Sequence, residues 1–529
     1  MRLVLTLAIV SAAAGHAVGQ TITQVLPGAA ERSARVVVVG SEFGASQSGS
    51  SVTVDGIPAV VTWWSDSRIH AHVPHEAELG PAEVRVVRDQ SSEPAELSVL
   101  PRAGADGRIL WRLQVDHLYS LSRPAVASDG TIYATGVGGP LYAVTPSGEV
   151  KWVVQNAGGA RPATVSSDGT VYTSGAGGAI SAISAEGGVL WSYRAPSNAG
   201  GVFVGPNVGP DGKIYAVTQE EPSLGTDFGA FALHPDGTLA WSRSGGYNQR
   251  RIAYGWEVVF GGGLAYFITG QGNPINGNHG VHALDLGSGQ ESWMLPGTGR
   301  LQRDGAGNLY WLGAINNNFI GSYAGDGEQR WAVSYNDFVG QPGGYVVAPS
   351  GASYYCTSTF TTLAALAPDG STRWQHRDFN HLFDLHAVTP DGERFFGIAF
   401  PTDNTAPEMR LWSGDDGSVL WRQDVPREDD AWMAPQWEGQ LSPDGRVLYI
   451  TLSGNNYVQD PYSYLYAIDV SEAGPCAADI DGNGSVNTLD VLAFLNAWSS
   501  GDEAADFNAD GAVNTLDVLA YLNAWSARC

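Results

Sequence analysis

A phrase repeated along the middle of the chain constrains the fold more than any other feature. From about residue 105 to 470, a glycine stands four residues before a tryptophan eight times. The pairs are Gly107/Trp111, Gly148/Trp152, Gly187/Trp191, Gly237/Trp241, Gly289/Trp293, Gly327/Trp331, Gly370/Trp374 and Gly417/Trp421. Most are preceded by a turn dipeptide with an apolar-aromatic stretch, as in Asp129-Gly130-Thr131-Ile132-Tyr133, and then by a second stretch such as Leu141-Tyr142-Ala143-Val144. Asp-Gly and Ser-Gly turns between apolar stretches are strong hairpin signals. Units of about four short strands, repeated every 40–50 residues or so, predict a β-propeller over residues 105–470.

The repeat also predicts how the ring closes. Seven complete units follow Trp111, and an eighth begins at Asp444-Gly445 and runs through Leu465-Tyr466-Ala467-Ile468 without its own tryptophan. The strand around Ile109-Leu110-Trp111 can supply the missing outer strand, which removes the open edges of the ring. We expect eight blades, with seven as the alternative.

The phrase resembles the PQQ-like, or quinoprotein-type, repeat, best of all in Ala283-Leu284-Asp285-Leu286-Gly287-Ser288-Gly289 before Trp293. The resemblance implies that the glycine turns the chain into the outermost strand and that the tryptophan docks between blades. Quinone-dependent dehydrogenases of this kind carry a vicinal cysteine pair, whereas this region contains only Cys356. We therefore expect no PQQ cofactor.

Polar side chains gather in some of the connections between units, most densely at His376, Arg377, Asp378, His381, Asp384 and His386. Such residues can bind a metal or perform acid–base chemistry. Their spacing matches no known catalytic signature, so we favour solvated loops and inter-blade hydrogen bonds, with a ligand pocket as the alternative.

Residues 21–100 contain short alternating stretches separated by turns, which predict an immunoglobulin-like sandwich. The segment resembles the IPT/TIG family at Pro27, Gly40-Ser41-Glu42-Phe43-Gly44, Trp64-Ser65-Asp66, Ile69, Val73-Pro74 and Gly80. The resemblance implies a spacer, stalk or binding domain. Adjacent strand residues point to opposite faces, so one of Trp63 and Trp64 should face the core rather than a sugar.

Two oxygen-rich loops near the carboxyl end carry the strongest functional signal. Each has oxygen-bearing side chains at loop positions 1, 3, 5, 9 and 12, a glycine at position 6 and a backbone carbonyl available at position 7. Calcium takes six to eight oxygens from such a loop. The predicted ligands are Asp479, Asp481, Asn483, Ser485, Asn487 and Asp490 in the first loop, and Asp506, Asn508, Asp510, Ala512, Asn514 and Asp517 in the second. We expect two Ca²⁺ sites.

Each loop is followed by a predicted helix, and no convincing helix precedes it. Val491-Leu492-Ala493-Phe494-Leu495-Asn496-Ala497-Trp498 is repeated 27 residues later with one change, and its leucines three apart form an apolar stripe. Residues 476–529 thus resemble a type I dockerin, although position 12 is aspartate rather than the glutamate of ordinary EF-hands. The resemblance implies docking to a cohesin-like protein through positions 10 and 11, which are Thr488, Leu489, Thr515 and Leu516. A purely structural calcium clamp is the alternative.

Cys476 and Cys529 stand just outside the two repeats. Symmetry between the repeats would bring these ends together, and a disulfide there could stabilise the module by roughly 4 kcal/mol. A surface-anchoring role for Cys529 is the alternative.

The amino-terminal residues 1–19 resemble a cleaved export signal. Met1-Arg2 precedes an apolar run from Leu3 to Ala14, and Ala17-Val18-Gly19 is a small-residue cleavage site. The run is shorter than the roughly 20 residues of a membrane span, and we expect no transmembrane segment elsewhere. The prediction is a secreted, extracellular protein, with association to the cell surface as a further option.

The formal net charge of −26, with only two lysines, argues against a nucleic-acid partner. The sequence therefore predicts a secreted, non-catalytic adaptor. Its propeller would present a platform for a carbohydrate or protein ligand, and its dockerin would join an extracellular or cell-surface assembly. The alternative is an enzyme of a polysaccharide-degrading or a quinone-dependent sugar- or alcohol-oxidising complex.

Overall fold

The computed structural model describes residues 20–527 with gaps. The gaps are 103–107, 116–121, 137–138, 159–160, 176–178, 195–201, 219–227, 246–257, 270–279, 315–318, 335–343, 357–361, 404, 426, 429–430, 436–438, 455–462, 472–477, 479, 481–487, 503–504 and 509–511. The predicted export signal therefore lies outside the described residues. The chain forms two compact units, Met1–Arg102 and Ala103–Cys529.

The first unit is a sandwich of two sheets. One sheet has the order β1 (Thr21–Leu26), β3 (Arg35–Ser41), β7 (Arg68–His72), β6 (Val60–Trp64). The other has the order β2 (Ala29–Glu31), β9 (Ala95–Leu100), β8 (Gly80–Val87), β4 (Ser51–Val54), β5 (Ile57–Pro58). Alternate valines, such as Val36 and Val38 in β3 and Val84 and Val86 in β8, fill the space between the sheets.

The pair Trp63-Trp64 divides between the two sides of its strand, as predicted. Trp64 packs against the core, and its indole Nε1 donates to the carbonyls of Phe43 and Gly44 at 3.2 and 3.1 Å. Trp63 is 43% exposed and its ring lies 5.1 Å from the ring of His70.

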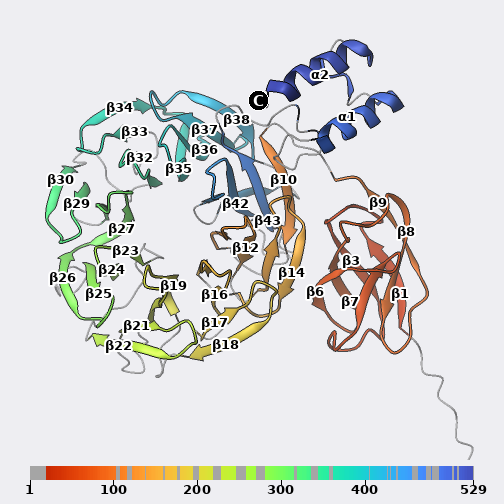
Figure 1. Ribbon diagram of the computed structural model, residues 1–529, viewed down its shortest axis with the longest axis horizontal. Coiled ribbons are helices and arrows are strands. Elements are labelled where there is room, and N and C mark those ends of the chain that lie inside the picture. Colours follow the sequence, from red (N-terminus) through yellow and green to blue (C-terminus); the bar gives the residue numbers. More distant parts are fainter. Residues whose placement is uncertain are drawn as a thin grey trace, which may run out of the picture. The chain divides into compact units, whose positions relative to one another are not determined.

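Antiparallel sheets dominate the second unit. Seven of them have the orders β11 (Ala125–Val126), β12 (Ile132–Thr135), β13 (Leu141–Val144), β14 (Val150–Val154); β15 (Thr164–Val165), β16 (Val171–Ser174), β17 (Ala179–Ile183), β18 (Val189–Arg194); β19 (Val202–Val208), β20 (Ile214–Thr218), β21 (Phe228–Leu233), β22 (Leu239–Gly245); β23 (Val259–Gly261), β24 (Leu264–Thr269), β25 (Gly280–Asp285), β26 (Glu291–Pro296); β27 (Thr298–Arg303), β28 (Leu309–Ala314), β29 (Phe319–Tyr323), β30 (Gln329–Ser334); β31 (Tyr345–Val347), β32 (Ser353–Cys356), β33 (Thr362–Leu366), β34 (Thr372–Arg377); and β35 (His381–Val388), β36 (Arg394–Pro401), β37 (Glu408–Ser413), β38 (Val419–Asp424). They are arranged around a ring, with fourth strands such as β18, β26 and β34 on the outside (Figure 1). This is the predicted propeller architecture.

The ring closes as the sequence predicted. A further sheet has the order β10 (Ile109–Val115), β43 (Ser463–Asp469), β42 (Val447–Gly454), β40 (Ala431–Pro435), β39 (Arg427–Glu428), with β41 (Gln440–Leu441) paired to β42. The first strand of the propeller thus pairs antiparallel with the last, for example Arg112 with Tyr466. The Arg108 guanidinium adds a bond from Nη1 to the carbonyl of Ser471 at 2.7 Å. The two ends of the ring are held together by backbone pairing.

The repeated spacing of glycine and tryptophan has a direct physical cause in the contacts between neighbouring sheets. The indole Nε1 of Trp191 in β18 donates to the carbonyl of Pro235, in the turn before β22 of the next sheet, at 2.8 Å. Gly237 in the same turn has φ +85°, and a Cβ at this position would lie 2.7 Å from the Trp191 ring. Only glycine adopts this backbone conformation readily and leaves room for the indole.

The same indole-to-carbonyl bond recurs around the ring. The pairs are Trp111 to Pro146, Trp152 to Ala185, Trp241 to Leu286, Trp293 to Gly325, Trp331 to Pro368 and Trp374 to Gly414, at 2.7 to 3.3 Å. The tryptophans therefore dock between neighbouring blades, as the family resemblance implied.

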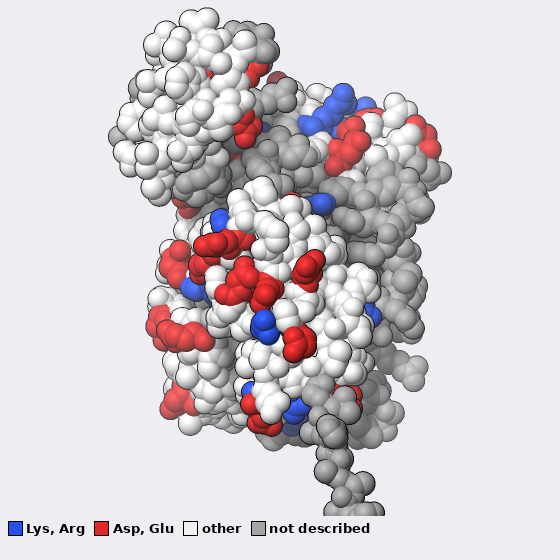
Figure 2. All heavy atoms as spheres, turned by 90° about the vertical axis from the view of Figure 1, so that its right-hand side faces the viewer, with Lys and Arg blue, Asp and Glu red and all other residues white. Residues whose placement is uncertain are grey.

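The carboxyl-terminal module contains two helices, α1 (Thr488–Ser500) and α2 (Thr515–Ala527). Within the described part of the chain, no helix is long and apolar enough to cross a bilayer. Acidic side chains are spread more widely than basic ones over the face in Figure 2, in keeping with the negative net charge.

Candidate calcium and docking site

The second oxygen-rich loop closes on Asp517, the residue at its position 12. Asp517 lies in the first turn of α2 and is fully buried. Its Oδ1 accepts the backbone N–H of Asn508 at 3.1 Å, and its Oδ2 accepts that of Asn514 at 2.7 Å. The Asp517 carboxylate at position 12 therefore joins Asn508 at position 3 to Asn514 at position 9.

Hydrogen bonding also sets the charge state of this carboxylate. The backbone N–H groups of Asn514, Asn508 and Phe507 lower the pKa of Asp517, against the effect of its desolvation. The group therefore stays ionised at neutral pH. A calcium ligand must be in this state.

Asn514, at position 9, organises the start of α2. Its Oδ1 accepts the backbone N–H of Leu516 at 2.8 Å, which is the bond of a helix N-cap. Its Nδ2 donates to the carbonyl of Ala512 at 2.9 Å. The structure thus brings together the side chain predicted at position 9 and the carbonyl predicted at position 7.

Asp490 is the first-loop counterpart of Asp517, and it is also fully buried in the first turn of its helix. The other ligands predicted for that loop, Asp479, Asp481, Asn483, Ser485 and Asn487, lie outside the described residues. The same is true of Asp510 in the second loop and of the predicted disulfide partners Cys476 and Cys529.

The core of the module reflects its internal repeat. Phe494 of α1 and Tyr521 of α2 occupy equivalent positions 27 residues apart, and their rings stack at 4.1 Å with an interplanar angle of 7°. Phe507 packs edge-on against both rings. The Trp498 indole donates to the carbonyl of Asn514 at 2.8 Å, which ties α1 to the second loop. Aromatic side chains thus fix the inner faces of both helices.

The residues predicted to contact a partner lie outside the aromatic core of the module. Thr488, Leu489, Thr515 and Leu516 are all exposed, although each is within two residues of a buried aspartate. The leucine stripe of each helix is exposed as well, because the larger aromatic rings occupy the core.

The polar residues expected in solvated loops lie mostly in strands, because His376 and Arg377 end β34 whereas His381, Asp384 and His386 belong to β35. Asp378 lies between the two strands, and a hydrogen-bonded group forms around His381. The Arg410 guanidinium donates from Nη2 to Nε2 of His381 at 2.9 Å, so the other ring nitrogen carries the proton. That nitrogen, Nδ1, lies 2.6 Å from Oδ2 of Asp378. Arg410 also bonds Glu408 through Nε at 2.6 Å. Both ring nitrogens of His381 are therefore engaged within the propeller.

The remaining histidines of this cluster lie in separate surroundings. His386 is buried with Nε2 3.7 Å from Asp384, whereas His376 bonds the carbonyl of Asp416 in the next blade. Among the described residues, no group of three or more histidine, cysteine or acidic side chains could hold a metal ion.

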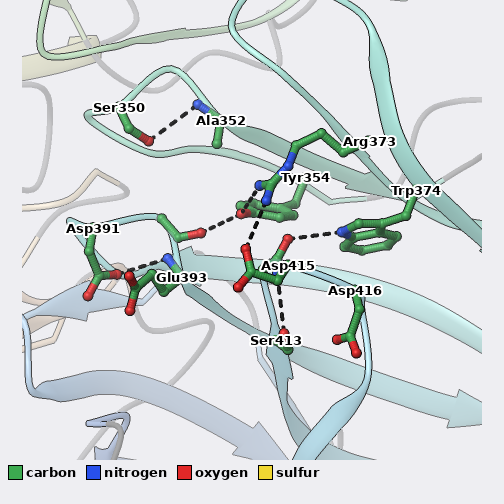
Figure 3. Close-up of polar contacts among 12 residues, drawn as sticks. Ser350, Ala352, Tyr354, Arg373, Trp374, Asp391, Glu393, Ser413, Asp415 and Asp416 are labelled. Carbon is green, nitrogen blue, oxygen red and sulfur yellow. Dashed lines mark hydrogen bonds and ion pairs between the residues drawn. The ribbon is translucent and has the colours of Figure 1, made fainter.

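Figure 3 shows how polar groups join neighbouring blades around Tyr354 and Trp374. Arg373 in β34 donates from Nη2 to Oδ1 of Asp415 at 2.9 Å and approaches the Tyr354 hydroxyl at 3.5 Å. The Tyr354 hydroxyl donates to the carbonyl of Gly392, and Trp374 donates to that of Gly414 at 2.9 Å. These side chains hold the blades together.

Cys356 is buried in the propeller, where its Sγ donates to the carbonyl of Phe383 at 3.0 Å. Burial raises the pKa of this thiol well above its usual range. The thiol is therefore protonated and unreactive at neutral pH.

A cavity of about 470 Å³ opens where inner strands of the propeller end. Val126, Ala127, Ser128, Pro349, Val388, Pro390, Gln440, Leu441, Ser442 and Pro443 line it. No charged side chain contributes to this lining, so it suits an uncharged ligand better than a charged one.

Comparison with known families agrees with this architecture. Family models match residues 21–99 as an IPT/TIG domain, residues 96–333 as a family described as outer membrane protein assembly factor BamB, and residues 473–524 as a dockerin type I domain. No curated protein matches the chain.

Solved structures with a similar fold are distant in sequence. BamB from Moraxella catarrhalis is 12% identical with a TM-score of 0.43, covering 66% of this chain and 97% of that one. A quinohemoprotein alcohol dehydrogenase, ADHIIG from Pseudomonas putida HK5, is 14% identical with a TM-score of 0.48, covering 71% and 78%. Sqt1 from Saccharomyces cerevisiae is 9% identical with a TM-score of 0.45, covering 70% and 100%. These similarities carry no argument about activity.

The chain is thus a multidomain protein of an IPT/TIG domain, a region of PQQ-like propeller repeats and a type I dockerin domain, in that order. Type I dockerin domains bind calcium.

Proposed function

We propose that this protein is a secreted, non-catalytic adaptor that docks to a cohesin-like partner through its calcium-loaded dockerin. The assembly would be extracellular or at the cell surface, where dockerin proteins typically act. The propeller would present the platform that binds a carbohydrate or protein ligand.

One contrast within the dockerin carries this proposal. In both halves, position 12 is a fully buried aspartate, while the adjoining positions 10 and 11 are exposed. A buried carboxylate is costly unless a cation or hydrogen bonds compensate its charge. An ion held on the inside of each loop would therefore fix the start of each helix, with Thr488-Leu489 and Thr515-Leu516 facing outward.

The residues present fit a calcium ion. The donors are carboxylate, amide and carbonyl oxygens, which calcium prefers, and they come from Asp479, Asp481, Asn483, Ser485, Asn487 and Asp490 and from Asp506, Asn508, Asp510, Ala512, Asn514 and Asp517. The bound ion would supply the positive charge that lets these acidic loops close. The chain's own part is to hold Asp517 ionised and Asn514 at the helix start.

A binding assay against a panel of recombinant type I cohesin domains tests the docking proposal. We expect at least one cohesin to bind the full chain in calcium and to dissociate when a chelator is added. The double variant Leu489→Lys/Leu516→Lys should lose this binding, because a lysine at each exposed position 11 would have to be desolvated against the partner. The control Leu79→Lys changes an exposed leucine of the first unit and should bind normally.

The enzymatic alternative has its own test. Polysaccharides, and sugars or alcohols supplied with PQQ and an electron acceptor, should show no turnover with the full chain. Turnover by the purified protein would replace the adaptor proposal with an enzyme. Failure of every cohesin to bind would remove the docking role.

A further inference from the structure

Each dockerin helix exposes three leucines spaced three residues apart. The stripe on α1 consists of Leu489, Leu492 and Leu495, which are 58%, 57% and 39% exposed, and the stripe on α2 consists of Leu516, Leu519 and Leu522, at 58%, 59% and 41%. We call these the leucine stripes. A contiguous apolar surface of this kind marks an interaction site rather than ordinary surface.

The two helices carry no exposed charge. Their sequences contain no lysine, arginine or glutamate, and their only aspartates, Asp490 and Asp517, are fully buried. This surface belongs to a chain whose formal net charge is −26. Two copies of the chain can therefore approach here without placing like charges against each other, which is not true of the acidic surface elsewhere.

The leucine stripes cannot satisfy one another within a single module. The inner faces of α1 and α2 are already occupied by the stacked rings of Phe494 and Tyr521. The stripes follow the i±3 rows of each helix, and such rows pack as ridges into the grooves of another helix. A partner surface for these rows has to come from outside the helix pair.

The internal repeat makes the two stripes nearly the same surface, since TLDVLAFLNAWS in α1 corresponds to TLDVLAYLNAWS in α2. A helix pair of this kind can meet its own copy around one twofold axis, with α1 of each molecule against α2 of the other. Such an isologous contact uses all the leucines and closes on itself.

We propose that a second copy of this chain docks onto the leucine stripes and forms a twofold dimer through the dockerin helices. This inference rests on the proposed function in one respect, namely that bound calcium folds the two helices. The leucine stripes include Leu489 and Leu516, so self-pairing and binding of a cohesin-like partner compete for one surface. In the dimer the docking face is covered until a partner displaces the second copy.

Sedimentation velocity of the full chain in calcium tests this proposal over the micromolar range, at low and high salt. The weight-average sedimentation coefficient should rise with concentration toward that of a dimer. Association should be stronger at high salt, because salt screens the repulsion between two acidic chains and leaves an apolar contact intact. A charge-driven contact would weaken instead.

Variants separate the leucine stripes from other exposed leucines. Leu492→Gln and Leu519→Gln should each weaken dimerisation by roughly tenfold or more, and to a similar extent. The matched control Leu79→Gln/Leu190→Gln removes two leucines of similar exposure elsewhere and should dimerise normally. Circular dichroism of each variant checks that α1 and α2 are folded.

Two outcomes would overturn the proposal. One is a monomer at every concentration in a protein that binds calcium and is folded. The other is equal dimerisation by the stripe and control variants. A monomer that still binds a cohesin domain overturns self-pairing and leaves the docking role standing. A dimer that binds no cohesin domain supports self-pairing and overturns the docking role.

Discussion

Replacement of Gly237 by alanine should destabilise the propeller more than the same replacement at Gly212. Both glycines lie in turns of one blade and have left-handed backbones, with φ of +85° and +76°. A Cβ at Gly237 would lie 2.7 Å from the Trp191 ring, whereas nothing lies within 4 Å of one at Gly212. The pair therefore separates the backbone penalty from the inter-blade clash.

The magnitude follows from these two contributions. Alanine in the left-handed region costs about 1–2 kcal/mol, which is the whole expected effect of Gly212→Ala. Displacing the indole from its site adds the usual overpacking cost of about 1–3 kcal/mol at Gly237. We expect Gly237→Ala to lower the free energy of unfolding by about 2–5 kcal/mol.

Urea unfolding of the full chain, followed by tryptophan fluorescence, measures both variants. In a Trp191→Ala background the clash is absent, so the two glycine variants should then have similar effects. Equal destabilisation of the two variants in the wild-type background would refute the claim that Gly237 leaves the space in which the Trp191 indole packs. So would an excess cost at Gly237 that persists without Trp191.

Three further predictions concern single groups. Trp152→Phe removes the indole bond to the carbonyl of Ala185 and should cost about 1 kcal/mol in calorimetric unfolding of the full chain, and an unchanged transition would contradict the bond's role. Asp517→Asn should remove one calcium ion per chain in a titration, because it removes the charge that closes the second loop; undiminished stoichiometry would argue against that site. Burial, and secondarily Asp444, raises the pKa of Tyr449 at the ring closure to about 12, so the folded state favours the neutral phenol. The contribution of Tyr449 to stability should therefore be constant below about pH 10 and should be lost as the pH rises from about 10 to 12, as unfolding titrations of the wild type and Tyr449→Phe across that range would show; a contribution that grows there would contradict the shift.

The propeller could be predicted from the sequence because one physical constraint recurs around the ring. A glycine in the turn before an outer strand lies against the indole of the preceding blade, as Gly237 does against Trp191, and the same contact is found at Gly187, Gly289, Gly327, Gly370 and Gly417. The missing eighth tryptophan identified Trp111 as the residue that closes the ring. A repeated local rule is visible without knowledge of the three-dimensional structure.

The polar group around His381 could not be predicted in the same way. Arg410 and Glu408 determine the surroundings of His381, yet they lie in β37, far along the chain. Only the pairing of β35, β36 and β37 brings them together. The sequence indicated which polar residues were dense, and the sheet register decided which of them touch.

The dockerin falls between these cases. The repeat indicated the loops and an apolar stripe on each helix, but not which face would be buried. Phe494 and Tyr521 bury larger surfaces than leucine and take the core, which leaves the leucines outside.

Calorimetric titration of Ca²⁺ into the metal-free full chain tests the central claim most directly. Two oxygen-rich loop sequences, each with a buried aspartate at position 12, predict two ions bound per chain. A titration without heat of binding would contradict the account of the dockerin as a calcium-dependent docking module.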